Sequence, residues 1–414
     1  MTSPVLVLHP FRASRYTTRG DLGRQLCPPY DVISPEQRDA LSAACDTNAV
    51  RVVLPGDAEA ALADSDRYAG ARHLLDSWVA DDVLRVDAEP ALYVYEMATE
   101  GQLTRGLLGA VEIRDPADGV ILPHENTMGG PVADRLALME ATEADLEPIY
   151  LVYDGGGAAS ELVAAVDSRE PVAEALTPDG IRHRLWAVTD PAELEGVRDD
   201  LAQRRALIAD GHHRYATYRQ RQAARGGRPG PWDRGLTLLV DTSTYGPQVH
   251  PIHRVVTIDL DRAVAALGPV ARVSAPMSLA DALHELEEST TFAVVLASGD
   301  WAVVASDLDP GTVADGLGST SPVLGRLEVT VLHRVLVEHL WGLTDDEQTV
   351  GYAHDVDEAL ASAGADHTAV LLRATPVEDV AAVAAAGERM PRKSTKFTPK
   401  PASGMVFRRF ADER

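Results

Sequence analysis

"RALIADGHHRYATY", residues 205–218, joins a short apolar run to a segment with helix-forming composition. The apolar run predicts a strand that ends at Asp210, and the remainder predicts a helix that begins at Gly211. Two histidines and Arg214 therefore open a helix directly after a strand. The backbone N–H groups and the dipole at such a helix start attract an anion. The stretch thus predicts an α/β fold with a phosphate site at this junction.

The side chains of the junction suit different roles. Arg214 can grip phosphate oxygens with two hydrogen bonds, and Gly211 lets the backbone approach a ligand closely. Asp210 can hold a metal ion or accept a proton. His212 and His213 are adjacent and point apart, and no further ligand follows at the spacing of a zinc site. We expect His213 to contact phosphate and His212 to assist catalysis; the alternative is that the pair only caps the helix.

Strand-like and helix-like segments alternate along the rest of the chain. Apolar and β-branched runs predict strands at 91–97, 106–114, 147–154, 183–190, 235–243, 253–260, 290–298, 301–307 and 368–375. Helical spacing predicts helices at 58–83, 131–139, 159–168, 191–204, 329–342 and 377–387. Over 414 residues this alternation predicts a mixed α/β (α+β) protein with more than one unit. We place an α/β region with most of the motifs at 1–257 and a second α/β region at 258–414.

Composition restricts the partners and the compartment. A net charge of −25 disfavours binding to nucleic acid or to an anionic membrane, because both need a positive field. No stretch reaches the length of a membrane span, and the first residues lack the pattern of a signal peptide. The two cysteines are too few for a disulfide framework. We therefore expect a cytoplasmic protein that binds neither membranes nor, in general, nucleic acid.

The lysines are unevenly distributed. Of the 38 lysines and arginines, the three lysines Lys393, Lys396 and Lys400 all lie in MPRKSTKFTPKPASG, residues 390–404. A solvated basic tail and a phosphate site both fit this pattern, since an ammonium differs from a guanidinium fork as an anion ligand. The prolines and apolar residues of the stretch favour order. We predict that residues 390–407 are ordered and that Lys393 or Lys396 faces the same cleft as the 205–218 junction.

A second motif, ILPHENTMGGPVADR, occupies residues 121–135. His124 and Glu125 follow a short apolar run and precede a turn, after which Pro131 can open a helix that carries Arg135. Titratable side chains on a loop at a strand end are well placed for acid–base chemistry. The alternative is that Glu125 or a neighbouring threonine caps the turn. We expect Glu125 to be a catalytic base, and His124 and Arg135 to bind substrate.

Two weaker motifs complete the set. LCPPYDVISPEQ, residues 26–37, has a proline-stiffened loop that presents Tyr30 and Asp31. HPIHRVV, residues 250–256, brings His253 and Arg254 to the start of a strand. We expect these four side chains to contribute to substrate binding.

PPYDVI, PHENT, the DR at 134–135, ADGHHRY, HRVV and MPRKSTKFTPKPASG occur in this order, with a characteristic spacing. From about Pro10 to Phe407 the chain resembles the bacterial and archaeal family known as domain of unknown function 1015. That family looks similar to the ParB/sulfiredoxin-like superfamily. The resemblance implies a ParB/sulfiredoxin-like core with mixed sheets and additional α/β elements, with the C-terminal tail folded back on the core.

Two members of that superfamily carry related motifs. Sulfiredoxins have a Gly-Cys-His-Arg-Tyr stretch that binds ATP phosphates; this chain has His212 at the position of their catalytic cysteine, which makes sulfinic-acid repair an unsuitable activity. Free serine kinases have an Asp-Gly-His-Thr-Arg stretch, which Asp210 to Arg214 resembles more closely. In those enzymes the motif serves the nucleotide phosphates and the substrate hydroxyl, and a glutamate elsewhere is the base.

These observations predict a nucleotide-dependent phosphotransferase, a kinase that acts on a small hydroxyl compound, with free L-serine as the first candidate. ATP or ADP would be the donor and Mg²⁺ the cofactor. Arg214, the helix start and Lys393 or Lys396 would hold the phosphates, while Asp210 would carry Mg²⁺ or orient the hydroxyl. Glu125 would be the base, with a histidine as the alternative.

Two other classes of function remain open at this point. One is a ParB-like nucleotide switch that binds DNA or a partner protein. The other is a metal-binding hydrolase that uses the histidines. The sequence leaves open whether the protein is a monomer or a homodimer.

Overall fold

The computed structural model describes residues 4–17, 22–63, 66–299 and 301–413. The chain forms a mixed α/β protein with two compact units. The first unit comprises residues 1–123, 127–247 and 399–414, and the second comprises 124–126 and 248–398. The chain thus leaves the first unit at Pro247, ten residues before the expected boundary, and returns to it at Pro399. Among the described helices, none is long and apolar enough to cross a membrane.

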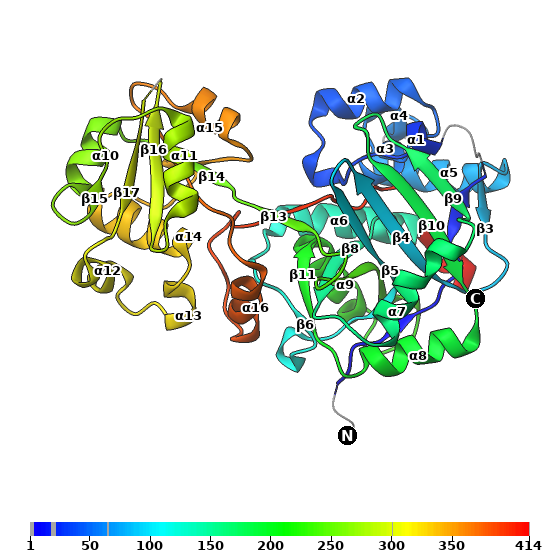
Figure 1. Cartoon of the computed structure of the whole chain (residues 1–414). Coiled ribbons are helices and arrows are strands. Elements are labelled where there is room, and N and C mark those ends of the chain that lie inside the picture. The colour runs from blue at the N-terminus through cyan, green and yellow to red at the C-terminus, as the bar shows by residue number, and fades with distance from the viewer. Residues whose placement is uncertain (1–3, 18–21, 64–65, 300, 414) are drawn as a thin grey trace. The chain divides into compact units, whose positions relative to one another are not determined.

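A nine-stranded mixed sheet forms the centre of the first unit (Figure 1). Its main path runs β6-β11-β8-β12-β5-β4-β10-β9, and β1 pairs with β5. β11 is parallel to β6, and β12 is parallel to β8, while the other pairs are antiparallel. The strands are β1 (Leu8–His9), β4 (Leu92–Thr99), β5 (Gln102–Glu112), β6 (Ile121–Leu122), β8 (Ile149–Tyr153), β9 (Ala173–Leu176), β10 (Arg182–Val188), β11 (Ala206–Asp210) and β12 (Arg234–Asp241).

Helices and small strand pairs surround this sheet. The helix α6 packs against α5 and α9, and α7 packs against α8 (Figure 1). The helices are α1 (Leu22–Gln25), α2 (Pro35–Ala44), α3 (Val50–Val53), α4 (Asp57–Ala60), α5 (Arg67–Ala80), α6 (Gly129–Thr142), α7 (Ala158–Ala165), α8 (Pro191–Leu201) and α9 (His212–Ala224). The two outer ladders pair β2 (Ser14–Tyr16) with β3 (Leu84–Val86), and β7 (Ala144–Asp145) with β21 (Arg408–Arg409).

A six-stranded sheet, in the order β15-β17-β16-β19-β14-β18, is the core of the second unit. In β16, Val294 and Leu296 enter one hydrophobic cluster, whereas Val295 enters another on the opposite face. Because both faces are covered, the strand is apolar throughout instead of alternating with polar residues. The strands are β14 (His253–Val256), β15 (Arg272–Val273), β16 (Ala293–Ser298), β17 (Trp301–Ser306), β18 (Val350–Ala353) and β19 (Thr368–Leu371).

Helices cover this sheet, and a two-stranded ladder pairs β13 (Gln248–His250) with β20 (Lys396–Thr398). The helices are α10 (Leu260–Leu267), α11 (Leu279–Glu288), α12 (Pro310–Leu317), α13 (Pro322–Gly325), α14 (Glu328–Val331), a π-helical stretch (Leu332–Leu340), α15 (Val356–Ser362) and α16 (Val377–Ala385).

Two predicted elements were wrong in extent. The strand expected at 253–260 ends at Val256, because the Asp259 side chain accepts from Arg262 N–H and caps α10. The helix expected at 58–83 is two helices, α4 and α5, and the Asp66 side chain caps the second. In both cases a short polar side chain provides an acceptor for the first turn of a new helix, which ends the preceding element.

The prediction that the C-terminal tail is ordered and folded back on the core is confirmed. Ser14 and Phe407 exchange two backbone hydrogen bonds, as do Cys27 and Ser403. The chain from Pro399 onward therefore belongs to the first unit, although the sequence places it after the second.

Candidate functional site

The 205–218 junction folds as predicted. β11 ends at Asp210, and α9 begins at His212 with Gly211 as its N-cap. Gly211 has a φ of 92°, a left-handed conformation that a side chain would strain. No side chain caps the helix start. A Cβ at Gly211 would lie 3.1 Å from the Nε atom of Arg214, so glycine also leaves room for that guanidinium.

Arg214 is buried beneath the helix start, with an exposed fraction of 4%. It donates to Pro148 O at 2.5 Å and to Asp210 Oδ2 at 2.6 Å, while its Nε–H has no hydrogen-bond partner. Burial opposes the charge of Arg214, but the carboxylates of Glu147 and Asp210 outweigh burial and raise its pKa. The guanidinium is therefore firmly cationic and keeps one buried donor unused, which typically costs about 1–3 kcal/mol.

Lys400 lies between two carboxylates of this cluster. Its Nζ is 2.6 Å from Asp210 Oδ1 and 3.1 Å from Asp31 Oδ2. Burial opposes the ammonium charge, but Asp210 and Asp31 outweigh it and raise the pKa of Lys400. Burial likewise opposes ionisation of Asp31, yet attraction by Lys400 lowers the pKa of that carboxyl. The expected lysine–aspartate contact thus exists, but Lys400 makes it.

Glu147 organises the other side of the cluster. It is 5% exposed, and its Oε1 accepts from Tyr30 N–H at 3.0 Å and from Ser403 Oγ–H at 2.8 Å. The guanidinium of Arg135 lies over the Tyr30 ring, 4.2 Å from its centroid, and donates to Val53 O. Tyr30, Asp31, Arg135, Asp210 and Arg214 are therefore gathered in the first unit, as the sequence motifs indicated.

The PHENT motif divides between the units. Met128 N–H donates to His213 Nε2 at 3.1 Å, which joins the start of α6 to the start of α9 in the first unit. His124 and Glu125 belong to the second unit. There His124 is fully buried: its carbonyl accepts from Met390 N–H at 2.9 Å and its Nε2 lies 3.1 Å from Thr395 Oγ1. The second and the lysine-bearing motifs therefore meet through these contacts.

The HRVV motif supports the same part of the second unit. Arg254 is fully buried and donates to His333 Nε2 at 3.0 Å, to Ile252 O at 2.6 Å and to Arg392 O at 3.2 Å. His253 Nδ1 accepts from Leu372 N–H, and burial lowers the pKa of His253 to about 4.

The two lysines that were expected to bind phosphate belong to the second unit. Lys396 Nζ donates to His354 O at 3.3 Å, and Lys393 has a left-handed φ of 54°. Sequence reasoning therefore selected the wrong lysine for the contact with Asp210, since only pairing in the folded chain distinguishes Lys400 from the other two. Glu147 was also missed, because a lone glutamate before a strand carries no sequence signal.

Asp210 offers a poor metal site in this arrangement. Its two carboxylate oxygens are taken by Lys400 and Arg214. Hard oxygen ligands suit Mg²⁺, but the Lys400 ammonium occupies the position between Asp210 and Asp31. Within the described ranges, no group of three or more His, Cys, Asp or Glu side chains could hold a metal ion. The residues therefore do not fit a resident metal ion.

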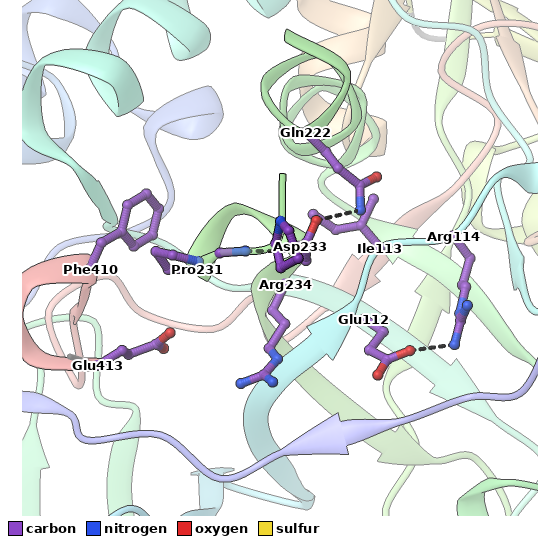
Figure 2. A pocket seen from close by; sticks show the side chains of 11 residues that line it. Glu112, Ile113, Arg114, Gln222, Pro231, Asp233, Arg234, Phe410 and Glu413 are labelled. Carbon is purple, nitrogen blue, oxygen red and sulfur yellow. Dashed lines mark hydrogen bonds and ion pairs between the residues drawn. The ribbon is translucent and has the colours of Figure 1, made fainter. Parts of the chain in front are cut away.

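Another pocket of the first unit, of about 510 Å³, is lined by none of the sequence-predicted site residues (Figure 2). Its charges are largely paired: Arg114 bonds Glu112, and Gln222 donates to Asp233 at 3.1 Å. Arg234 also points into it. This pocket provides a useful comparison region, distinct from the Asp210 cluster.

A family model described as "Protein of unknown function (DUF1015)" matches residues 8–330, which is most of the chain. The chain belongs to this family. No curated protein matches its sequence.

Three solved structures illustrate the fold similarity. SbnI with a C-terminal truncation, from Staphylococcus aureus, is 11% identical with a TM-score of 0.37, over 72% of this chain and 86% of that chain. A free serine kinase in complex with AMP is 15% identical with a TM-score of 0.35, over 72% and 91%. A conserved hypothetical protein from Pyrococcus furiosus is 14% identical with a TM-score of 0.35, over 74% and 97%.

Proposed function

We propose that this protein is a nucleotide-dependent phosphotransferase that acts on a small hydroxyl compound, with free L-serine as the first acceptor to test. The observation that carries the proposal is the buried cationic cluster at the uncapped start of α9. Arg214 has an unused donor there, Gly211 provides a close backbone approach, and Lys400 adds an ammonium. Such a cluster can stabilise the charge that phosphoryl transfer spreads over the phosphate oxygens.

The cluster is organised by exchangeable carboxylates. Asp210 and Asp31 hold Lys400 in place, and Asp210 also holds Arg214. A phosphate that enters would replace carboxylate oxygens as the partner of these cations. Because charge-assisted hydrogen bonds to a phosphate are at least as strong, this exchange can occur without leaving a buried cation unpaired.

We assign the phosphates to Arg214, Lys400 and the α9 start with His213, and the acceptor hydroxyl to the neighbourhood of Asp210. Adenine nucleotides, ATP or ADP, are the donors to test first. We expect Mg²⁺ to arrive with the nucleotide, since Asp210 is already paired with two cations. The protein's own contribution is then to bind, orient and neutralise.

Glu125 remains our proposed general base. It is 25% exposed, and its Oε1 lies 4.0 Å from the buried His124 ring, which can help to set its orientation. A glutamate in this role accepts the proton of the acceptor hydroxyl as the oxygen attacks the phosphorus. His212, 8% exposed at the start of α9, is the alternative base.

The direct test is a screen of ATP and ADP against hydroxy amino acids and polyols, with products identified by mass spectrometry. The proposal expects a phosphorylated acceptor and the matching nucleotide product, and it expects both to disappear in the Arg214→Ala variant. Nucleotide binding without any phosphorylated acceptor would instead favour a nucleotide switch. Retention of duplex DNA in a gel-shift assay at low salt would support that alternative.

A further inference from the structure

An apolar pocket of about 440 Å³ borders the Asp210 cluster within the first unit. It lies between α2, the 26–29 loop and the 177–183 turn, and Lys400 lies at its edge. Most of its lining is aliphatic, including Leu26, Pro28, Pro29, Ile33, Leu41 and Ile181. This volume falls in the range of small-molecule pockets, which is about 300–1,000 Å³.

The helix α2 is stable at its start but poorly packed. Ser34 and Gln37 form a reciprocal capping box, and Pro35 occupies the first turn. Yet none of its ten residues is buried. Helices in proteins gain most of their stability by packing an apolar face, and here that face, with Leu41, borders the pocket. A ligand in the pocket would supply the packing that α2 lacks.

The inner wall of the pocket is polar in composition but uncharged at neutral pH. His183 is 1% exposed, and its ring nitrogens bond Tyr95 OH at 2.7 Å and Thr177 Oγ1 at 3.1 Å. Burial lowers the pKa of His183 to about 4, and burial raises that of the Cys27 thiol. An occupant of this wall therefore meets neutral surfaces.

Cationic charge enters the pocket at one end only, through Lys400. The same ammonium lies 2.6 Å from Asp210 Oδ1, so the pocket and the proposed phosphate site share a residue. A ligand with an apolar ring at one end and an anionic group at the other would match both regions at once. Gln37, whose Oε1 accepts from Ser34 N–H, has an amide NH₂ group at the pocket rim that can donate to a ring edge.

We propose that this pocket holds the base of the nucleoside phosphate whose phosphates bind at Arg214 and Lys400. The proposal rests on the proposed function, and it adds the place of the base and the reason for nucleotide preference. Burial of the ring against Leu41 and Ile181 would supply affinity that inorganic polyphosphate cannot obtain. It would also order α2.

The first experiment uses the wild-type protein and compares ATP, ADP and inorganic tripolyphosphate by isothermal titration calorimetry. We expect the nucleotides to bind at least about tenfold more tightly than tripolyphosphate, a difference of about 1.4 kcal/mol. Equal affinity for ATP and tripolyphosphate would overturn the base pocket but leave the phosphotransferase proposal standing. Binding of none of the three would overturn both.

The second experiment fills the pocket. Leu41→Trp and, independently, Ala44→Trp place an indole in the space, while Ala43→Trp on the same helix is the matched control, because Ala43 does not line the pocket. We expect the two filling variants to lose at least tenfold in ATP affinity and to keep tripolyphosphate affinity, which also reports an intact fold. Unchanged ATP affinity in both variants would overturn the pocket assignment.

Discussion

Arg214 in the first unit and Arg254 in the second are both almost fully buried, yet their partners differ in charge. Arg214 is surrounded by carboxylates, which raise its pKa despite burial. Arg254 bonds two carbonyls and a histidine, and burial lowers its pKa to about 10. A cation balanced by carboxylates can exchange them for phosphate, whereas a cation held by neutral acceptors is a structural clamp. The difference separates a binding group from a positioning group of the same residue type.

The His333 ring explains how Arg254 can be held without a direct carboxylate. Asp345 Oδ1 lies 3.0 Å from His333 Nδ1, which fixes the proton on that nitrogen and leaves Nε2 as the acceptor for Arg254. Arg254 in turn holds the carbonyl of Arg392, next to the lysine-bearing motif. We therefore interpret Arg254 as a residue that positions the 390–398 segment.

The largest expected effect concerns the chemical step. Glu125→Gln keeps the shape and hydrogen-bonding reach of the side chain but cannot accept a proton, so turnover should fall about 10²–10⁴-fold. Nucleotide affinity, which we assign to the first unit, should change far less. Steady-state kinetics and calorimetry measure the two quantities separately. Near-native turnover in this variant would transfer the role to His212 or Asp210.

The next effect tests the clamp. Arg254→Met removes the donor from two buried carbonyls and from His333, and each unsatisfied buried group costs about 1–3 kcal/mol. We expect unfolding of the second unit to become easier by about 3 kcal/mol, followed by the fluorescence of the buried Trp341 in denaturant. Arg334→Met is the matched control, because Arg334 makes only an exposed pair with Glu338. Equal stability of the two variants would contradict the clamp.

The counterpart in the first unit is a binding effect. Arg214→Ala should weaken nucleotide binding by about 1.5–3 kcal/mol, the usual contribution of a hydrogen bond to a charged group. Arg234→Ala, in the pocket of Figure 2, is the control and should leave affinity unchanged. If calorimetry gives equal affinity for the two variants, Arg214 is not a phosphate ligand.

The smallest effect is a pH dependence of the second unit. His253 has a folded-state pKa of about 4, below its ordinary value of 6.5, so the unfolded chain binds a proton more readily. Stability is therefore full above about pH 6.5 and falls as pH decreases toward 4. Between pH 7.5 and 5.5 this residue should cost about 1.4 kcal/mol.

His253→Asn is the matching variant, because its side-chain oxygen can still accept from Leu372 N–H but does not titrate in this range. Denaturant unfolding at several pH values, followed by Trp341 fluorescence, gives the slope for both proteins. The same slope in the variant would show that another group causes the acid sensitivity.

Part of the site could be read from local chemistry. The apolar run that ends at Asp210 and the glycine that follows it specify a strand, a left-handed residue and a helix start, whatever surrounds them. The strand expected at 253–260 failed for a local reason too, since Asp259 is a strong helix cap.

By itself, the sequence determined the α/β character, the 205–218 junction and the order of the C-terminal stretch, because periodicity, capping and glycine conformation act over a few residues. Only the tertiary structure decided that Lys400 rather than Lys396 meets Asp210, and that Glu147 anchors Tyr30 and Ser403. These pairings join residues separated by more than a hundred positions, where burial forces each charge to find a partner that no local pattern encodes.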